Sequence, residues 1–347
     1  MTDSHTGVLL SPDAVAAARK QAERILEGLD RAILGQKQLT RLVLTGCLAR
    51  GHVLLEGLPG LGKTELVKAL ASLLGLNFRR LQFTPDLLPG DITGGHLLEQ
   101  NESGARKLVF HAGPIFCNIL LADEINRASP KTQSALLEAM QEKHVTVLGE
   151  TRPLPFPFYV LATQNPIELE GTYPLPEAQL DRFLFKLDVH RIDRETMQSI
   201  LTDRRAGKPP ALEPVTNETE LRELFKSVDA IFLPKAVAAY ISKLIDSLHP
   251  ASEFATEKVK NFVKYGPSPR AGIAIAEAGR AHALLAGKPN VGFDDVRTVA
   301  PWAVAHRIVV DYRARLEGVT GRDIVDSALQ SVGELDEAPP ESLTDKR

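Results

Sequence analysis

Residues 57–64 of this chain read Gly57-Leu58-Pro59-Gly60-Leu61-Gly62-Lys63-Thr64, a glycine followed by four residues and then Gly-Lys-Thr. This is the phosphate-loop pattern, in which glycines let backbone N–H groups crowd around phosphate oxygens because no side chain stands in the way. Lys63 would supply a point charge for the phosphates, and the Thr64 hydroxyl can ligate Mg²⁺. A helix starting near Thr64 would add the positive end of its dipole. The pattern therefore predicts a site for the phosphates of a nucleotide.

The residues on both sides of this loop support the prediction. His52-Val53-Leu54-Leu55-Glu56 is a short apolar run typical of a buried strand. From Glu65 to Leu74 the apolar residues recur at helical spacing. The order of strand, glycine loop and helix is the context in which the motif works, and it argues against a chance glycine-rich turn.

Composition bounds the class of protein. The chain has 347 residues, enough for two domains, and its hydrophobic content of 44% and charged content of 24% are ordinary for a globular protein. A formal net charge of −3 does not favour nucleic acid or an anionic membrane as a partner. Cys47 and Cys117 fall in apolar stretches, as buried thiols do in a reducing compartment. The nine histidines form no cluster with metal-ligand spacing. With no apolar run of about 18 residues and no signal-peptide pattern, we predict a cytoplasmic protein without membrane insertion.

The first part of the chain alternates between strand and helix patterns. We expect a frayed segment at 1–11, helices at 12–29 and 37–50, and a helix at 131–142. The predicted strands, most of them strongly apolar, are 52–56, 78–83, 118–123, 158–163 and 184–189. Apolar strands that alternate with helices predict an α/β fold with a parallel sheet covered on both faces.

Two stretches interrupt this alternation. Residues 93–113 and residues 144–153, which turn near Gly149, have the patterns of hairpins. Hairpins added to an α/β core are usually surface devices for a partner or substrate, although a decorative loop is the alternative.

After about Asp193 the strand patterns stop. Helical patterns follow, and prolines separate them, at 221–224, 235–248, 257–265, 271–285 and 293–306. We therefore predict three parts: a nucleotide-binding core at 1–192, an all-helical domain at 193–332, and a disordered acidic tail at 333–347.

Two further strand ends carry polar side chains. The run from Asn118 to Ala122 delivers Asp123 and Glu124 to a strand end, where ligands bind in open α/β sheets. Asp123 can hold Mg²⁺ directly or through water, and Glu124 can act as a general base on the attacking water. Asn165 follows the next strand and could orient that water, although an asparagine before proline is more often a turn residue. A solvated strand end is the alternative for the acidic pair, and the phosphate loop about sixty residues earlier argues against it.

Several longer strings resemble AAA+ ATPases, and within them the MoxR family. The resemblance covers about residues 30–310 and rests on Gly57–Gly60, Gln82–Pro89, Asp123–Ala128, Gln133–Met140, Ala162–Pro166 and Leu175–Phe183. Departures are Gly90, where the family commonly has serine, and Pro267, where it often has alanine. Neither change removes a chemical group that the mechanism needs.

The resemblance implies the fold and the roles of further residues. It implies a nucleotide-binding core, a helical lid, and a ring that is usually a hexamer. Arginines are usually solvated, but Arg182 matches the arginine that reaches a neighbouring subunit's γ-phosphate, and Arg270 matches the sensor 2 position. Asn165 matches sensor 1, and the hairpins match the helix-2 insert and the pre-sensor-1 hairpin. The segment 33–36 matches the adenine pocket, so the expected nucleotide contacts are Gly35, Gln36, Gly57, Pro59, Gly60, Leu61, Gly62, Lys63, Thr64 and Glu65.

The activity implied is hydrolysis of ATP with Mg²⁺, used to remodel or mature a protein client such as a metal- or cofactor-containing enzyme. The resemblance also implies a partner with a von Willebrand factor A domain. Two alternatives stay open, a magnesium-chelatase-type subunit and a nucleic-acid motor. The net charge argues against the motor, and the Leu-Pro-Glu-Ala-Gln string at 175–179 favours MoxR over the chelatase.

Overall fold

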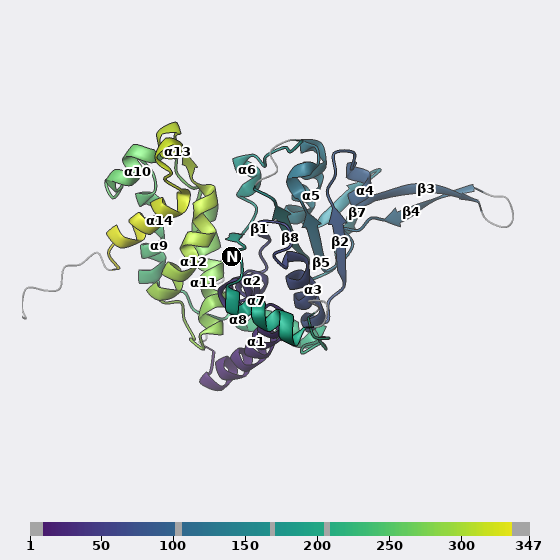
Figure 1. Cartoon of the computed structure of the whole chain (residues 1–347), viewed down its shortest axis with the longest axis horizontal. Coiled ribbons are helices and arrows are strands. Elements are labelled where there is room, and N and C mark those ends of the chain that lie inside the picture. Colours follow the sequence, from purple (N-terminus) through teal and green to yellow (C-terminus); the bar gives the residue numbers. More distant parts are fainter. Residues whose placement is uncertain (1–9, 101–105, 167–170, 205–208, 335–347) are drawn as a thin grey trace, which may run out of the picture. The chain divides into compact units, whose positions relative to one another are not determined.

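The computed structural model describes residues 10–100, 106–166, 171–204 and 209–334. The chain divides into two compact units (Figure 1). The larger unit is Lys20–Lys226 and contains the main sheet. The smaller one combines Met1–Arg19 with Ser227–Arg347.

The larger unit is built on a five-stranded parallel sheet with the order β2-β5-β8-β1-β9. Its strands are β1 (Val53–Glu56), β2 (Phe78–Gln82), β5 (Ile119–Asp123), β8 (Tyr159–Gln164) and β9 (Phe185–Asp188). Each lies within a residue or so of a predicted strand, so the α/β fold with a parallel sheet is confirmed. The register aligns Glu56 with Gln164, and Gln82 with Asp123. The carboxyl ends of these strands therefore meet at one edge of the sheet.

Helices connect the strands, as the alternation predicted. The helices α3 (Lys63–Leu74) and α5 (Pro130–Glu142) lie between strands of the sheet, and α1 (Pro12–Ala32) and α2 (Lys37–Leu48) precede β1. The α3 helix follows the phosphate loop directly, because Gly62 takes a left-handed conformation at its N-cap. Gly75 takes the same conformation at the other end, where its N–H caps the last carbonyls of the helix.

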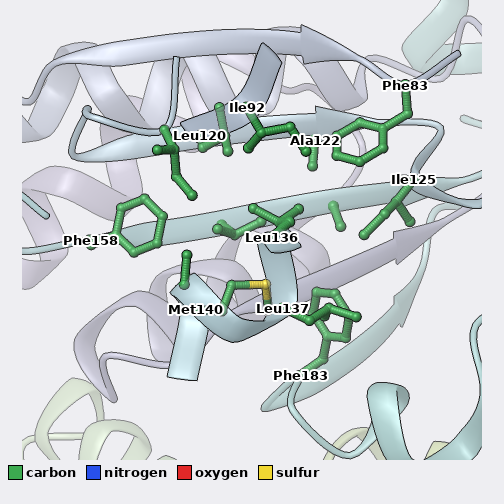
Figure 2. Close-up of a cluster of buried hydrophobic side chains, with 14 of the residues drawn as sticks. Phe83, Ile92, Leu120, Ala122, Ile125, Leu136, Leu137, Met140, Phe158 and Phe183 are labelled. Carbon is green, nitrogen blue, oxygen red and sulfur yellow. The ribbon is translucent and has the colours of Figure 1, made fainter. Parts of the chain in front are cut away.

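A buried apolar cluster fixes the strand that carries the acidic pair. Figure 2 shows Leu136 and Met140 of α5 gathered with Leu120 and Ala122 of β5 and with Phe158 before β8. Leu120, Ala122 and Leu136 are fully buried, and each such leucine contributes about 1.5–3 kcal/mol relative to exposure. This packing holds the carboxyl end of β5 in a defined position.

Both predicted hairpins are present. The first pairs β3 (Gly94–Gln100) with β4 (Arg106–Ala112), and the second pairs β6 (His144–Val147) with β7 (Glu150–Pro153). The first follows a short helix, α4 (Pro89–Thr93), and extends away from the sheet of its unit (Figure 1). The Arg152 guanidinium lies 4.0 Å from the centre of the Phe110 ring, so the two hairpins are in contact.

The segment after the sheet belongs to the larger unit. It holds α7 (Arg194–Asp203) and most of α8 (Glu218–Asp229), whereas α6 (Glu177–Leu180) lies between β8 and β9. Arg204 donates to the carbonyls of Arg31 and Ala32 at 2.6 and 2.7 Å, and the Phe225 ring meets the Phe156 ring edge-on at 6.0 Å. The compact units therefore divide at Lys226, whereas the sequence analysis placed the start of the second domain at residue 193.

The smaller unit is helical, as predicted. Its helices after α8 are α9 (Lys235–Ser247), α10 (Glu257–Phe262), α11 (Pro269–Leu285), α12 (Phe293–Val304), α13 (Tyr312–Glu317) and α14 (Gly321–Ser331). The expectation that strands stop at residue 193 was wrong in one place. Here β10 (Val263–Tyr265) pairs antiparallel with β11 (Val309–Val310). Val263 is β-branched and extended, and the Gly-Pro pair after Tyr265 disfavours a longer helix.

Residues 1–9 and 335–347 lie outside the described residues, so the frayed start and almost all of the predicted acidic tail remain predictions. In the part of the chain that the structure describes, no helix is both long and apolar enough to cross a membrane.

Candidate nucleotide-binding site

Three neighbouring strands bring the predicted site residues to one cavity. The phosphate loop follows β1, Asp123 and Glu124 stand at the end of β5, and Asn165 follows β8. Because β5, β8 and β1 are adjacent and parallel, these groups meet at the same edge. The cavity has a volume of about 380 Å³ and is lined by Pro59, Gly60, Gly62, Lys63, Thr64, Glu65, Arg80, Gln82, Asp123, Glu124 and Asn165.

The three glycines of the loop are required for two different reasons. Gly60 and Gly62 have φ angles of +80° and +83°, and a Cβ at either would meet no atom within 4 Å. They shape the backbone and leave the space beside it open. Gly57 instead passes close to Val189, the residue after β9, since a Cβ at Gly57 would lie 2.7 Å from the Val189 carbonyl oxygen. The absence of a side chain at Gly57 therefore allows the loop to leave the sheet close to the Val189 backbone.

The Lys63 ammonium lies within the curve of the loop. Its Nζ donates to the Gly57 carbonyl at 2.6 Å and to the Gln164 carbonyl at 3.4 Å. Burial lowers the pKa of Lys63, and the carboxylates of Asp123, Glu124 and Glu56 oppose that shift. The side chain is thus a partly desolvated cation that donates hydrogen bonds to two carbonyls, and phosphate oxygens can replace these carbonyls.

The Asp123 carboxylate is held at both oxygens. The buried Thr163 hydroxyl donates to Oδ1 at 2.6 Å. Arg80 donates to Oδ2 twice, from Nη2 at 2.7 Å and from Nε at 3.1 Å. The side chain of Asp123 is only 12% exposed, so its charge is balanced inside the site by a guanidinium and a hydroxyl.

The Glu124 backbone is in a conformation that favours glycine. Its φ is +57°, which costs a non-glycine residue on the order of 1–3 kcal/mol. The Thr163 hydroxyl accepts from its N–H at 2.9 Å. Its Oε2 accepts from Gln82 Nε2 at 2.7 Å and from Arg127 Nη1 at 2.9 Å. These contacts hold a strained residue with its carboxylate facing the cavity, as expected for a group with a chemical role.

The other predicted contacts are partly brought together. Asn165 is buried and lines the cavity. Gln36 Nε2 donates to the Leu61 carbonyl at 3.5 Å, which places the 33–36 segment against the phosphate loop. Gly35 has a φ of +74° and packs on Thr196 of α7. Of the predicted nucleotide contacts, Gly35, Gln36, Gly57 and Leu61 are not among the residues that line the cavity.

The two arginines lie apart from this cavity or in the other unit. Arg182 belongs to the larger unit, yet it does not line the cavity in the described part of the chain. Its Nε is buried and has no hydrogen-bond partner among the described residues. Arg270 is exposed at the start of α11 in the smaller unit. Their predicted roles remain predictions.

Four contributors to the site were missed in the sequence. Thr163 contacts both acidic residues, Arg80 and Gln82 reach them from β2, and Arg127 pairs with Glu124. A signal was present for two of them. Alternation along the predicted strand 78–83 places Arg80 and Gln82 on one face at its carboxyl end. Nothing in the sequence alone showed that this strand lies next to β5.

The residues present fit a nucleotide with Mg²⁺. Two loop glycines leave open space where a Cβ would stand, beside a half-buried ammonium that donates to the carbonyls of Gly57 and Gln164. The metal would be held by Thr64 and Asp123, both of which line the cavity and offer the oxygen ligands that Mg²⁺ prefers.

Comparisons with known proteins agree with this geometry. Residues 52–185 match the ATPase family associated with various cellular activities (AAA), and residues 256–328 match the AAA lid domain. The chain is 41% identical to the chaperone MoxR1 of Mycobacterium tuberculosis, over 92% of this chain and 84% of that protein. It is 31% identical to the protein MoxR of Methylorubrum extorquens, over 84% and 89% of the two chains.

A solved structure extends the likeness to three dimensions. The crystal structure of a presumed ATPase from Cytophaga hutchinsonii superimposes with a TM-score of 0.83 at 35% identity, covering 92% of this chain and 97% of that one. These relatives share most of their length with this chain, and the chain belongs to the MoxR family of AAA+ ATPases.

Proposed function

We propose that this protein binds ATP at the cavity and hydrolyses it by in-line attack of water on the γ-phosphate. The observation that carries the proposal is the convergence of Lys63, Asp123, Glu124 and Asn165 on one cavity from three adjacent strand ends. Each of these residue types has a use in phosphoryl transfer, where catalysis consists of positioning and charge stabilisation.

The chain's own groups divide the work. Lys63 exchanges its carbonyl partners for phosphate oxygens, and the N–H groups of the glycine loop bind the remaining ones. Glu124 takes the proton of the attacking water, and Asn165 orients that water. Thr163 fixes both acidic residues through its two hydrogen bonds. When bound, Mg²⁺ supplies charge neutralisation at the phosphates from ligands Thr64 and Asp123.

The output would be remodelling of a protein client by an oligomeric ring, with a hexamer as the expected size. The chaperone name of the Mycobacterium tuberculosis relative supports a client of this kind. Arg182 supports a ring, because it lies outside the cavity of its own chain. The two hairpins are the surfaces that a client would meet, and a protein with a von Willebrand factor A domain is the proposed partner. The cytoplasm is the proposed location.

The proposal is tested by separating binding from chemistry. Glu124→Gln keeps the shape of the side chain and removes the base, so the variant should bind ATP normally by calorimetry and release phosphate ~10²–10⁴-fold more slowly. Lys63→Ala should lose ATP binding. Glu138→Gln, on the exposed face of α5 in the same unit, is the matched control and should behave like wild type. Turnover by Glu124→Gln within twofold of wild type would exclude Glu124 as the base.

The ring is tested by mixing two inactive variants. Arg182→Ala should bind ATP yet hydrolyse it poorly, because an arginine supplied by a neighbour contributes ~10³–10⁵ in rate in related reactions. Mixed with Lys63→Ala, it should regain activity wherever an intact Arg182 faces an intact phosphate loop. A mixture that assembles, by light scattering, and recovers nothing would contradict action between subunits.

A further inference from the structure

Arg80 is a cation inside the cavity that the mechanism above does not use. It lies on β2, the edge strand of the sheet, and its side chain is half-exposed while lining the cavity. Besides its two hydrogen bonds to Asp123, its Nη2 donates to Gln82 Oε1 at 3.0 Å. Gln82 in turn donates to Glu124, so one row of hydrogen bonds joins both acidic residues through two side chains of β2.

The hydrogen bonds to Asp123 leave little acceptor capacity. A carboxylate oxygen has about two lone-pair directions. At Oδ2 two N–H groups of Arg80 already use both, and at Oδ1 the Thr163 hydroxyl, which donates at 2.6 Å, uses one of the two. A metal ion, or a water bound to it, needs a free direction on this carboxylate. Thr163 is buried in the sheet and also accepts from Glu124, whereas Arg80 is half-exposed on an edge strand. Arg80 is therefore the partner that can leave.

We propose that Arg80 is a displaceable counter-ion: it holds Asp123 in the metal-free site, and Mg²⁺ with its nucleotide competes with it for this carboxylate. The inference rests on the proposed function, because it assumes that a Mg²⁺-nucleotide complex enters this cavity. Its consequence is that Arg80 weakens binding of the metal-bound nucleotide and has no such effect on the metal-free nucleotide. An arginine that bound phosphate directly would strengthen both.

The size of the effect follows from the exposure of the pair. Exposed ion pairs contribute at most about 1 kcal/mol, and two hydrogen bonds on one oxygen of a largely buried carboxylate place this pair near or slightly above that limit. The expected competition is therefore about three- to tenfold in affinity.

The test compares ADP binding by calorimetry in excess Mg²⁺ and in EDTA. The measured quantity is the dissociation constant in EDTA divided by that in Mg²⁺. Arg80→Ala should raise this ratio about three- to tenfold relative to wild type. Arg80→Met, which keeps the apolar stem of the side chain, should raise it equally if the charge is responsible. Arg79→Ala is the matched control, because Arg79 is exposed on the other face of the same strand and should leave the ratio unchanged.

The outcomes separate this inference from the function on which it rests. A ratio within twofold of wild type in both Arg80 variants, or a lower one, would overturn the role of Arg80. An equal rise in Arg79→Ala would also overturn it, since net charge alone would then explain the effect. If wild type binds no nucleotide in either condition while its thermal melt shows a folded protein, the proposed function fails first.

Discussion

Replacing Thr163 by valine removes one hydroxyl group from the centre of the site and keeps the volume of the side chain. Thr163 is 1% exposed, and its hydroxyl donates to Asp123 Oδ1 at 2.6 Å and accepts from the Glu124 N–H at 2.9 Å. A hydrogen bond to a charged group contributes about 1.5–3 kcal/mol, and a stranded buried donor costs about 1–3 kcal/mol. Because one hydroxyl makes both contacts, the two losses are not fully additive, and we expect Thr163→Val to cost about 2–4 kcal/mol.

The assay must report on the larger unit alone, because a chain of two units has no single free energy of unfolding. Hydrogen exchange of the β5 and β8 peptides does this. A loss of 2–4 kcal/mol corresponds to exchange about 30- to 700-fold faster in these strands. Thr163→Ser keeps the hydroxyl and should recover most of the protection. Thr146→Val, on the exposed second hairpin, is the matched control and should stay within about 0.5 kcal/mol of wild type.

Two results would contradict this role of the Thr163 hydroxyl. If β5 and β8 exchange in Thr163→Val within threefold of wild type, the hydroxyl does not hold the acidic pair. The same holds if serine is no better than valine, because restoring the hydroxyl would then restore no protection.

Two further predictions address the loop and the helical unit. Gly57→Ala should cost more stability than Gly62→Ala, because its Cβ meets the Val189 carbonyl at 2.7 Å. Gly62→Ala should cost only about 1–2 kcal/mol for its left-handed backbone, but it places a methyl group in the space for the phosphates. Hydrogen exchange of β1 and calorimetry with ADP should therefore rank the two variants in opposite orders, and the same order in both assays would contradict this account. In the helical unit, burial raises the pKa of Asp295, but hydrogen bonds from His282, the Gly292 N–H and Lys288 outweigh it, and the pKa lies below its usual range. A lowered folded-state pKa stabilises above the unfolded value of about 3.9 and is lost as the pH falls through the folded value, so the unit should weaken below about pH 4. Asp295→Asn should be about 1.5–3 kcal/mol less stable at pH 7 and flatter in its pH dependence; fluorescence of Trp302, the single tryptophan and a residue of α12, reports this unit, and a variant with the wild-type pH profile would rule the carboxylate out.

Most of the larger unit could be predicted because its signals are local. A buried parallel strand is a short apolar run, and the helices between the strands have their own period, so strand positions came within a residue or so. The hairpins were equally visible, since each has alternating residues around a turn. The strand pair β10–β11 was missed because two strands of three and two residues carry no measurable alternation. The packing of Arg204 on Arg31 and Ala32 was also out of reach, since a backbone carbonyl 172 residues away leaves no mark on the sequence pattern.

The site residues that could be predicted were also those with a local signal in the sequence. Lys63, Asp123, Glu124 and Asn165 could be found because each directly follows a strand or loop with a recognisable pattern, and parallel strands end at a common edge. Thr163 could not be assigned, because a threonine in an apolar strand is ordinary, and its role depends on facing β5 from β8.

The role of Arg80 depends on the pairing of β2 with β5, which the sequence pattern does not show. Its spacing to Gln82 is that of two side chains on one face of a strand, which any exposed edge strand can have. Only the register, with Gln82 opposite Asp123, turns that face toward the acidic pair. Two adjacent carboxylates are costly in a half-buried cavity without Mg²⁺. Arg80 balances the charge of Asp123, and Arg127 balances that of Glu124. A site that must accept Mg²⁺ benefits from a counter-ion on a solvent-facing edge, where the displaced guanidinium can be hydrated. The same pairing from a central strand would leave a buried cation without a partner, at a cost of several kcal/mol.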